Sequence, residues 1–285
     1  MKGVIVAAGY GTRFLPVTKT VPKEMLPLVT RPVIDIIVEE FERSGIDEIL
    51  IITSRRKKAL EDYFDREIEL ESVFKGQGAK EKLAAIVPRR ARIFFVRQQT
   101  MKGTGHALLQ ARPFLGEEPF VAAYPDDLHF GAVPLAKQLI DVYEETGCTV
   151  LATVHDPEQL NDYAVPKLDA DGIHVLDIVE KPAPGSEMSR EASIGRFLYS
   201  GDFLDKLAES YASFSGAGEF YHVGGIKKQI EERKVVIKRL SGTRVDTGTP
   251  AGYLRALVHY VSRDPDLMKV LAEEIAGYRG RAGAG

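Results

Sequence analysis

Three observations predict an α/β fold with a mostly parallel central sheet. First, the short apolar runs at residues 4–8 and 48–53 are typical of strands that are buried on both faces. Second, segments with helical spacing of apolar residues alternate with such runs, as in β-α-β units that close by right-handed crossovers. Third, a chain of 285 residues with 44% hydrophobic and 28% charged residues suits one large α/β domain, or a domain with an appendage.

The first half of the chain follows this alternation closely. Pro32 stands at the first position of a helix that ends at Ser44 and Gly45. Further strands are expected at 92–96, 119–124 and 148–154, and further helices at 55–64, from the loop 101–109 onwards, and at 134–146. The segment 63–83 also has a helical pattern, but the sheet does not need it. We therefore interpret it as an excursion from the main fold.

From Asp156 onwards the alternation is less regular. We expect loops at 161–166, 182–191 and 213–218, strands at 172–179, 194–199 and 235–240, and helices at 202–210, 223–232, 250–262 and 265–278. The loop 182–191 is polar and is a candidate mobile lid. Thr249 is the predicted N-cap of a helix that begins at Pro250. The Gly/Arg/Ala tail is expected to be frayed.

Composition excludes several classes of partner. The 38 basic and 41 acidic residues leave a net charge of −3, which gives no electrostatic reason to expect nucleic acid or a membrane. No apolar run approaches the ~20 residues of a membrane span. The single cysteine, Cys148, cannot form an internal disulfide, and its apolar neighbours indicate a small core residue rather than a nucleophile. We expect a cytoplasmic protein.

The first candidate site is the turn after the N-terminal strand. Gly9 and Gly11 let backbone N–H groups approach an anion closely, and Arg13 adds donors that suit phosphate oxygens. An ordinary tight turn is the alternative interpretation. Phe14 stands where the dinucleotide-binding fingerprint needs a third glycine, and the chain lacks the Gly-Lys-Ser/Thr of a P-loop.

A cationic loop follows this turn. Residues 14–27 contain three prolines, which prevent a regular helix, together with Lys19 and Lys23. We interpret the segment as a stiff loop that folds over a polyphosphate. The alternative is a solvated surface loop with incidental lysines.

Three further groups of polar residues follow predicted strands, where open α/β sheets bind ligands. Gln98 comes after the strand 92–96, and the glycine-bearing loop 101–109 opens a helix that could hold a nucleotide. Asp126 and Asp127 follow the strand 119–124; such adjacent carboxylates suit a hard divalent cation, although a turn or helix cap would also use them. Glu180 and Lys181 could hold a sugar hydroxyl and a phosphate, or form a surface ion pair.

Together these motifs resemble the sugar-1-phosphate nucleotidyltransferases, and most closely the bacterial UTP–glucose-1-phosphate uridylyltransferases. Three passages carry the resemblance: 7–13 with 22–27, 96–98 with 102–107, and 125–127 with 179–182. The excursion 64–83 is similar to one in the uridylyltransferase branch. The resemblance implies a Rossmann-like three-layer sandwich with a mixed, mostly parallel sheet, the nucleotidyltransferase fold. It also implies a nucleotidyltransferase domain at 1–262, with a nucleotide-binding part at about 1–155 and a sugar-binding part at about 156–262, before a C-terminal helix and tail at 263–285.

The implied reaction is a Mg²⁺-dependent attack of a sugar-1-phosphate oxygen on the α-phosphorus of UTP, which releases pyrophosphate without a covalent enzyme intermediate. By similarity, Arg13 and Lys23 are catalytic; Ala8, Gly9, Gly11, Gln98 and Gly103 bind the nucleotide; Asp127, Ala164, Glu180 and Lys181 bind the sugar phosphate; and Asp126 and Asp246 hold Mg²⁺. The physical interpretation agrees, because such chemistry needs positioning and charge neutralisation rather than an acid and a base. The resemblance further implies a homodimer or homotetramer.

Departures from the family pattern lie on the sugar side. Ala164 and Pro166 stand where the family has glycine and a smooth strand. The family pattern Gly-Glu-Ile-Gln-Leu-Thr-Asp reads here as residues 218–224, with Tyr221 in place of the glutamine and His222 in place of the leucine. These changes leave open another sugar 1-phosphate, or dTTP, as substrate. A non-catalytic sugar-nucleotide sensor is the alternative from a different class, and a dehydrogenase is disfavoured by Phe14.

Overall fold

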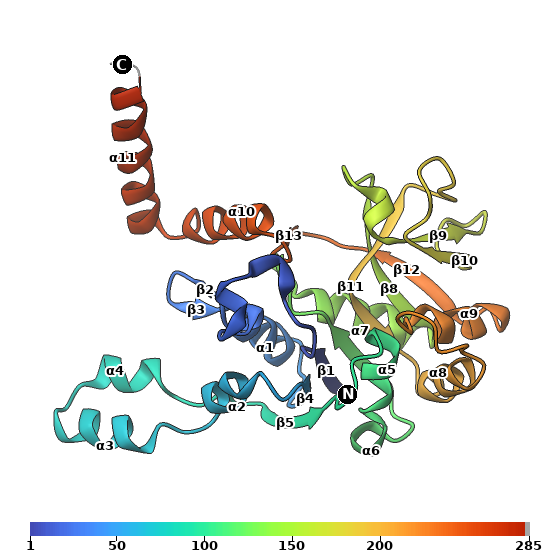
Figure 1. Cartoon of the computed structure of the whole chain (residues 1–285), viewed down its shortest axis with the longest axis horizontal. Coiled ribbons are helices and arrows are strands. Elements are labelled where there is room, and N and C mark those ends of the chain that lie inside the picture. The colour runs from blue at the N-terminus through green and yellow to red at the C-terminus, as the bar shows by residue number, and fades with distance from the viewer. Residues whose placement is uncertain (283–285) are drawn as a thin grey trace.

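In the computed structural model, residues 1–282 are described and form a mixed sheet with helices on both faces (Figure 1). The sheet consists of β1 (Lys2–Val6), β4 (Glu48–Thr53), β5 (Arg92–Arg97), β6 (Phe120–Ala123), β8 (Thr149–His155), β9 (Ala164–Leu168), β10 (Val175–Glu180), β11 (Glu191–Tyr199) and β12 (Val235–Arg239). Its main path runs β10-β9-β11-β6-β1-β4-β5, and β8 pairs with β11 and β12. The part from β6 to β5 is parallel, whereas β11 runs antiparallel to β6, β8 and β9.

Two helical layers cover this sheet, and a few helices stand away from it (Figure 1). The helices are α1 (Val33–Arg43), α2 (Lys58–Phe64), α3 (Ile68–Gly76), α4 (Lys80–Ala85), α5 (Thr104–Leu109), α6 (Arg112–Leu115), α7 (Leu135–Thr146), α8 (Phe203–Ala212), α9 (Val223–Glu231), α10 (Pro250–Val261) and α11 (Pro265–Ala282). Ile5 of β1 packs in one core cluster with residues of α1 and α7, whereas its neighbour Val4 packs in another with residues of α5, α8 and α9. Successive side chains of β1 therefore pack into two cores. The predicted three-layer α/β fold with a mixed sheet is confirmed.

Two short ribbons lie outside the main sheet. One joins β2 (Pro27–Leu28) to β3 (Arg31–Pro32), and the other joins β7 (Asp127–Phe130) to β13 (Thr243–Asp246). In the second ribbon Asp127 pairs with Asp246. This ribbon is not predictable from the sequence, because its strands are short, partly polar and more than a hundred residues apart. Short 3₁₀ turns at Thr12–Phe14, Val17–Lys19, Lys23–Met25 and Leu160–Asp162 complete the fold.

Two local predictions need correction. Residues 164–166 are not part of a loop but begin β9, where Pro166 pairs with Ile178 of β10. Proline is tolerated there because β11 pairs with β9 only at Ala164, so that one side of the strand is free beyond that residue. Cys148 lies just before β8 and is half-buried against the core rather than within it. The N-cap of α10 is as predicted, since the Thr249 hydroxyl accepts a hydrogen bond from the Gly252 N–H at 3.0 Å.

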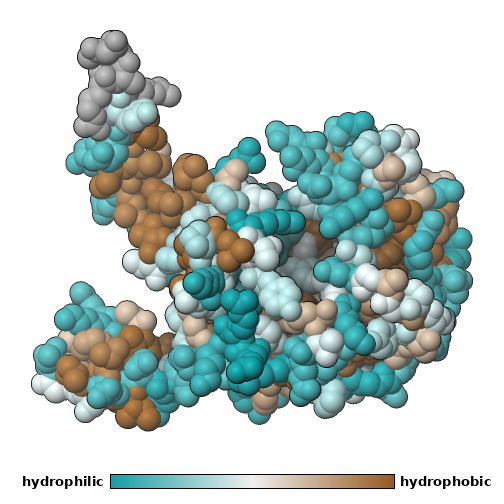
Figure 2. Space-filling model, viewed as in Figure 1, coloured by the Kyte–Doolittle hydropathy of each residue, from teal (hydrophilic) through white to brown (hydrophobic). Residues whose placement is uncertain are grey.

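The excursion and the C-terminal helix stand away from the body (Figure 1). The predicted excursion is confirmed as the helical pair α3 and α4. Helix α11 continues to Ala282, beyond the expected end at residue 278, and residues 283–285 of the predicted frayed tail lie outside the described residues. Hydrophobic side chains are exposed on α3, α10 and α11 (Figure 2). Among the helices described, none has the length and apolar character to cross a membrane.

Candidate active site

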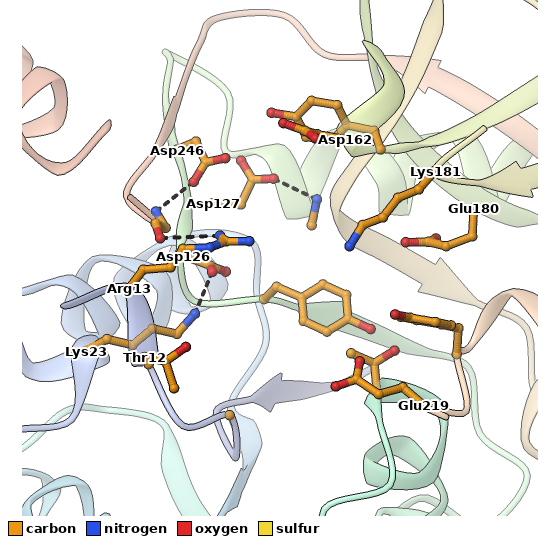
Figure 3. A pocket seen from close by; sticks show the side chains of 18 of the residues that line it. Thr12, Arg13, Lys23, Asp126, Asp127, Asp162, Glu180, Lys181, Glu219 and Asp246 are labelled. Carbon is orange, nitrogen blue, oxygen red and sulfur yellow. Dashed lines mark hydrogen bonds and ion pairs between the residues drawn. The ribbon is translucent and has the colours of Figure 1, made fainter. Parts of the chain in front are cut away.

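A cavity of about 490 Å³ opens at the carboxyl ends of β1 and β6 (Figure 3). Its lining comes from both halves of the chain, because β10 and the segment before α9 close the side opposite β1. The structure brings the following predicted site residues to it: Gly9, Gly11, Arg13, Lys23, Asp126, Asp127, Glu180, Lys181 and Asp246. The other predicted residues, which are Ala8, Gln98, Gly103 and Ala164, do not line it.

The turn after β1 forms the wall that was predicted to hold phosphates. Gly11 has a φ of 69°, which favours glycine, and its carbonyl accepts a hydrogen bond from the Thr18 hydroxyl at 2.8 Å. Arg13 is exposed, and its guanidinium lies 3.4 Å from the carbonyl oxygen of Gly248 at the same end of the cavity. Ala8 is buried beneath the turn, so its side chain supports this wall rather than facing the cavity.

Lys23 approaches the end of β6 from the cationic loop. Its ammonium lies 2.5 Å from Asp126 Oδ2 (Figure 3). Burial lowers the pKa of Lys23, but the neighbouring Asp126 and Glu24 outweigh it, and the net shift is upward. Burial alone would raise the pKa of Asp126, whereas Lys23 and Arg13 lower it overall. Both side chains are therefore charged, and the Lys23 ammonium lies at the end of the cavity next to the turn that was predicted to hold phosphates.

Asp126 and Asp246 face the same small space beside Gly248. A Cβ atom on Gly248 would lie 2.9 Å from Asp246 Oδ1 and 3.2 Å from Asp126 Oδ2, so a glycine is needed where the two carboxylates converge. Burial and the neighbouring carboxylates raise the pKa of Asp246, although the Gly248 N–H and Arg244 act in the opposite direction. A divalent cation nearby would stabilise the charged form of Asp246 and so lower its pKa.

The donor set at Gly248 fits Mg²⁺. In the part of the chain that the structure describes, no three His, Cys, Asp or Glu side chains form a metal-binding group. Mg²⁺ commonly takes only one or two protein carboxylates and completes its shell with substrate phosphates and water. Asp126 and Asp246 would provide two such carboxylates next to the turn that was predicted to hold phosphates.

Asp127 has a different environment from its neighbour Asp126. Its Oδ1 accepts a hydrogen bond from Arg244 Nε at 2.6 Å, and its Oδ2 accepts one from the Gly195 N–H at 2.7 Å. Arg244 also donates to the Tyr163 hydroxyl at 2.9 Å. Asp127, the residue that was predicted to bind the sugar phosphate, thus has both carboxylate oxygens engaged with protein groups. Its carboxylate joins β7, β11 and β13.

The far side of the cavity carries the Glu-Lys pair at the end of β10. Lys181 has a φ of 46°, and its N–H donates to the Tyr163 carbonyl at 3.1 Å. Burial raises the pKa of Glu180, although Lys181 opposes this. Figure 3 shows both side chains directed into the cavity, across from Arg13 and Lys23. The pair is therefore placed to meet a substrate with hydroxyl groups and a phosphate.

Ala164, which was predicted to bind the sugar phosphate, lies in β9 opposite Glu180. Its methyl group belongs to the apolar core on the α5 and α8 side and does not line the cavity.

Gln98 follows β5, and Gly103 belongs to the glycine-bearing loop 101–109 that was predicted to hold a nucleotide. Gln98 is buried, and its Nε2 donates to the Gly103 carbonyl at 3.1 Å. A Cβ atom on Gly103 would come within 2.6 Å and 2.8 Å of the Phe220 backbone. The loop is also tied to the segment before α9, since the Gly105 N–H donates to the Phe220 carbonyl at 2.9 Å. Both residues support this loop without lining the cavity, and their nucleotide-binding role stays a prediction.

Several lining residues were not predicted from the sequence: Thr12, Phe14, Thr104, Tyr124, Asp162, Tyr163, Gly195, Glu219, Tyr221, His222, Arg244 and Gly248. Tyr124 could have been found, because it ends a predicted strand at the same sheet edge as Asp126. Tyr221 and His222 were visible only as departures from the family pattern. The sequence carries no local signal that would place Arg244 or Gly195 beside Asp127.

Comparisons with known proteins agree with this geometry. Residues 2–263 match the family described as nucleotidyl transferase. A relative from Staphylococcus epidermidis, named UTP–glucose-1-phosphate uridylyltransferase, is 38% identical over 277 residues, which are 95% of each chain.

Two solved structures are similar in fold as well as in sequence. A UDP-glucose pyrophosphorylase complexed with UDP-glucose is 32% identical, with a TM-score of 0.80, and the match covers 92% of this chain and 100% of that one. A UDP-glucose pyrophosphorylase from Acinetobacter baumannii is 28% identical, with a TM-score of 0.87, and the match covers 98% and 99%. This chain therefore belongs to the nucleotidyl transferase family of enzymes, where its relatives are UTP–glucose-1-phosphate uridylyltransferases.

Proposed function

We propose that this enzyme transfers UMP from UTP to glucose 1-phosphate, and that it forms UDP-glucose and pyrophosphate in a Mg²⁺-dependent reaction. One observation carries the proposal: a single cavity has two cations and two converging carboxylates at one end and a Glu-Lys pair at the other. The names of the relatives support this pair of substrates.

In this mechanism the protein positions the triphosphate of UTP and the phosphate of the sugar, and it neutralises their charge. Bound Mg²⁺, held by Asp126 and Asp246, would supply positive charge to the triphosphate. Arg13 and Lys23 stabilise the negative charge that develops on the departing pyrophosphate. Lys181 holds the sugar phosphate so that its oxygen faces the α-phosphorus. No side chain is required to form a covalent bond with the nucleotide.

A different sugar 1-phosphate, or dTTP, is the second candidate. The departures at Tyr221 and His222 favour it, because both residues line the side of the cavity opposite the phosphate turn. A panel of UTP and dTTP with several sugar 1-phosphates, with pyrophosphate release as the readout, tests both candidates. A clear preference for another pair would replace the glucose assignment. Tight nucleotide binding without pyrophosphate release from any pair would support a sensor instead.

We further propose that residues 1–262 form the catalytic domain, divided near residue 155 between nucleotide and sugar binding, and that the protein works in the cytoplasm. We also propose a homodimer or homotetramer. Exposed apolar side chains such as Ile68 on α3, at 69% exposure, and Val270 on α11, at 58%, support self-association. Light scattering coupled to size-exclusion chromatography would test this, and a monomer at all concentrations would contradict it.

A further inference from the structure

Tyr124 lines the cavity but has no part in the mechanism described above. It follows β6 directly, and its N–H donates to the Gly195 carbonyl at 2.8 Å. The same cavity is lined by Glu180, which is assigned to the sugar hydroxyls, and by Asp126, which is assigned to the metal.

His222 holds the hydroxyl of Tyr124. The distance from the phenol oxygen to His222 Nδ1 is 3.0 Å, and the Thr104 hydroxyl lies 3.2 Å from the same nitrogen. The ring of Phe197 packs edge-on against both, with centroids 4.9 Å from His222 and 5.9 Å from Tyr124. Both rings are thus fixed by aromatic packing as well as by hydrogen bonding.

Burial keeps His222 uncharged. It lowers the pKa of His222 to about 4, so the imidazole is neutral near pH 7. A neutral imidazole accepts at one nitrogen and donates at the other, whereas a phenol has one donor and two lone pairs. With either imidazole tautomer, the Tyr124 hydroxyl keeps one hydrogen-bonding function for a ligand. Leucine, which the family pattern has at the position of His222, could not orient the phenol.

We propose that Tyr124 is a specificity-determining residue that binds one hydroxyl of the sugar 1-phosphate, and that His222 is a positioning residue that orients the phenol. The inference rests on the proposed function, since it assumes that Glu180 marks the place of the sugar. It assigns the sugar specificity of this chain to a pair of side chains, one from β6 and one from the start of α9. The same pair explains why the departures of residues 221–222 need not abolish sugar binding.

The experiment compares the wild type with Tyr124→Phe on glucose 1-phosphate and on its 2-, 3-, 4- and 6-deoxy analogues. We expect Tyr124→Phe to lower kcat/KM for the parent sugar by about tenfold, mainly through KM. For one deoxy analogue the two proteins should perform equally, because the hydroxyl that Tyr124 binds is already missing. Tyr278→Phe on the exposed face of α11 is the matched control and should behave as the wild type.

His222→Leu tests the positioning role. It should lower the discrimination against the same deoxy analogue, and the double variant should be no worse than Tyr124→Phe, because both changes act through one hydrogen bond. If His222→Leu only damages the structure, it should lower kcat/KM for all five sugars by the same factor, and its effect should add to that of Tyr124→Phe. Such a result would overturn the inference. An unchanged profile across the five sugars in Tyr124→Phe would overturn it as well.

A binding measurement separates this inference from the proposed function. Calorimetric dissociation constants of UDP-glucose and its deoxy analogues report the contact of Tyr124 even without turnover. If the wild type prefers another sugar 1-phosphate, the glucose assignment fails, and the deoxy series of that sugar then tests Tyr124 independently. Loss of discrimination by Tyr124→Phe supports the inference in either series, and retention overturns it.

Discussion

The ammonium of Lys57 lies 2.7 Å and 2.8 Å from the two carboxylate oxygens of Glu24, and both side chains are almost completely buried. Burial lowers the pKa of Lys57, although Glu24 acts in the opposite direction. Glu24 follows Lys23 in the 3₁₀ turn of the cationic loop. The buried pair therefore anchors the loop that places Lys23 against Asp126.

Removal of one partner of this pair should destabilise the fold. Lys57→Met leaves Glu24 buried without its cation, which typically costs about 3–5 kcal/mol. Lys57→Met with Glu24→Leu should recover most of the loss, because an apolar pair of similar size leaves no buried charge. Urea unfolding of the wild type, Lys57→Met, Glu24→Leu and the double variant gives the free energies. A double variant as unstable as the sum of the two single changes would contradict this account.

Loss of a cation from the phosphate end should reduce activity rather than stability. Arg13→Ala and Lys23→Ala should each lower the rate of pyrophosphate release by roughly 10²–10³-fold, because each removes a charge that stabilises the leaving group. Lys19→Ala is the matched control, since Lys19 is exposed in the same loop and does not line the cavity. A loss of similar size in Lys19→Ala would show that the loop matters only through its overall charge.

The adjacent carboxylates Asp126 and Asp127 should respond differently to amidation. Asp126→Asn and Asp246→Asn should lower the rate by roughly 10²-fold and raise the Mg²⁺ concentration needed for half-maximal activity. Asp127→Asn should lower the unfolding temperature, because it breaks the charged pair with Arg244. Magnesium titrations and thermal unfolding separate the two effects. A shifted magnesium requirement in Asp127→Asn with unchanged stability would reverse the assignment.

Burial of His222 should make stability depend on pH. Its folded-state pKa of about 4 lies below the ordinary value of 6.5, so the unfolded chain binds the proton first as the pH falls. This contribution is complete above pH 6.5 and should have fallen by about 2 kcal/mol at pH 5. His222→Asn should lack that part of the slope in urea unfolding at pH 7.5 and pH 5. An identical slope in both proteins would show that His222 is accessible to protons in the folded state.

The sequence predicted the parts of the site that lie in continuous motifs. Gly9, Gly11 and Arg13 follow one strand, and Asp126 follows another, so their shared position at one sheet edge could be inferred from parallel topology. Asp246 came from the family resemblance alone. Asp246 lies near Asp126 because β13 pairs with β7, and no local sequence pattern in either strand predicts that pairing.

The remaining parts depended on contacts between distant segments. Asp127 and Asp126 are chemically identical neighbours, and only Arg244 and the Gly195 N–H distinguish them. Tyr124 and His222 are almost a hundred residues apart and meet because the segment before α9 lies across the loop at Gly103. The strand β9 was mistaken for a loop because Pro166 is a strand breaker wherever both strand edges are paired.

The β7–β13 ribbon also bears on how the enzyme is made. It joins β7, the next strand after β6, to β13, the last strand among the described residues. A chain that leaves the ribosome N-terminus first can pair β1, β4 and β6 before β13 has been synthesised. Chains that have not yet reached β13 therefore lack Asp246, one of the two proposed metal ligands.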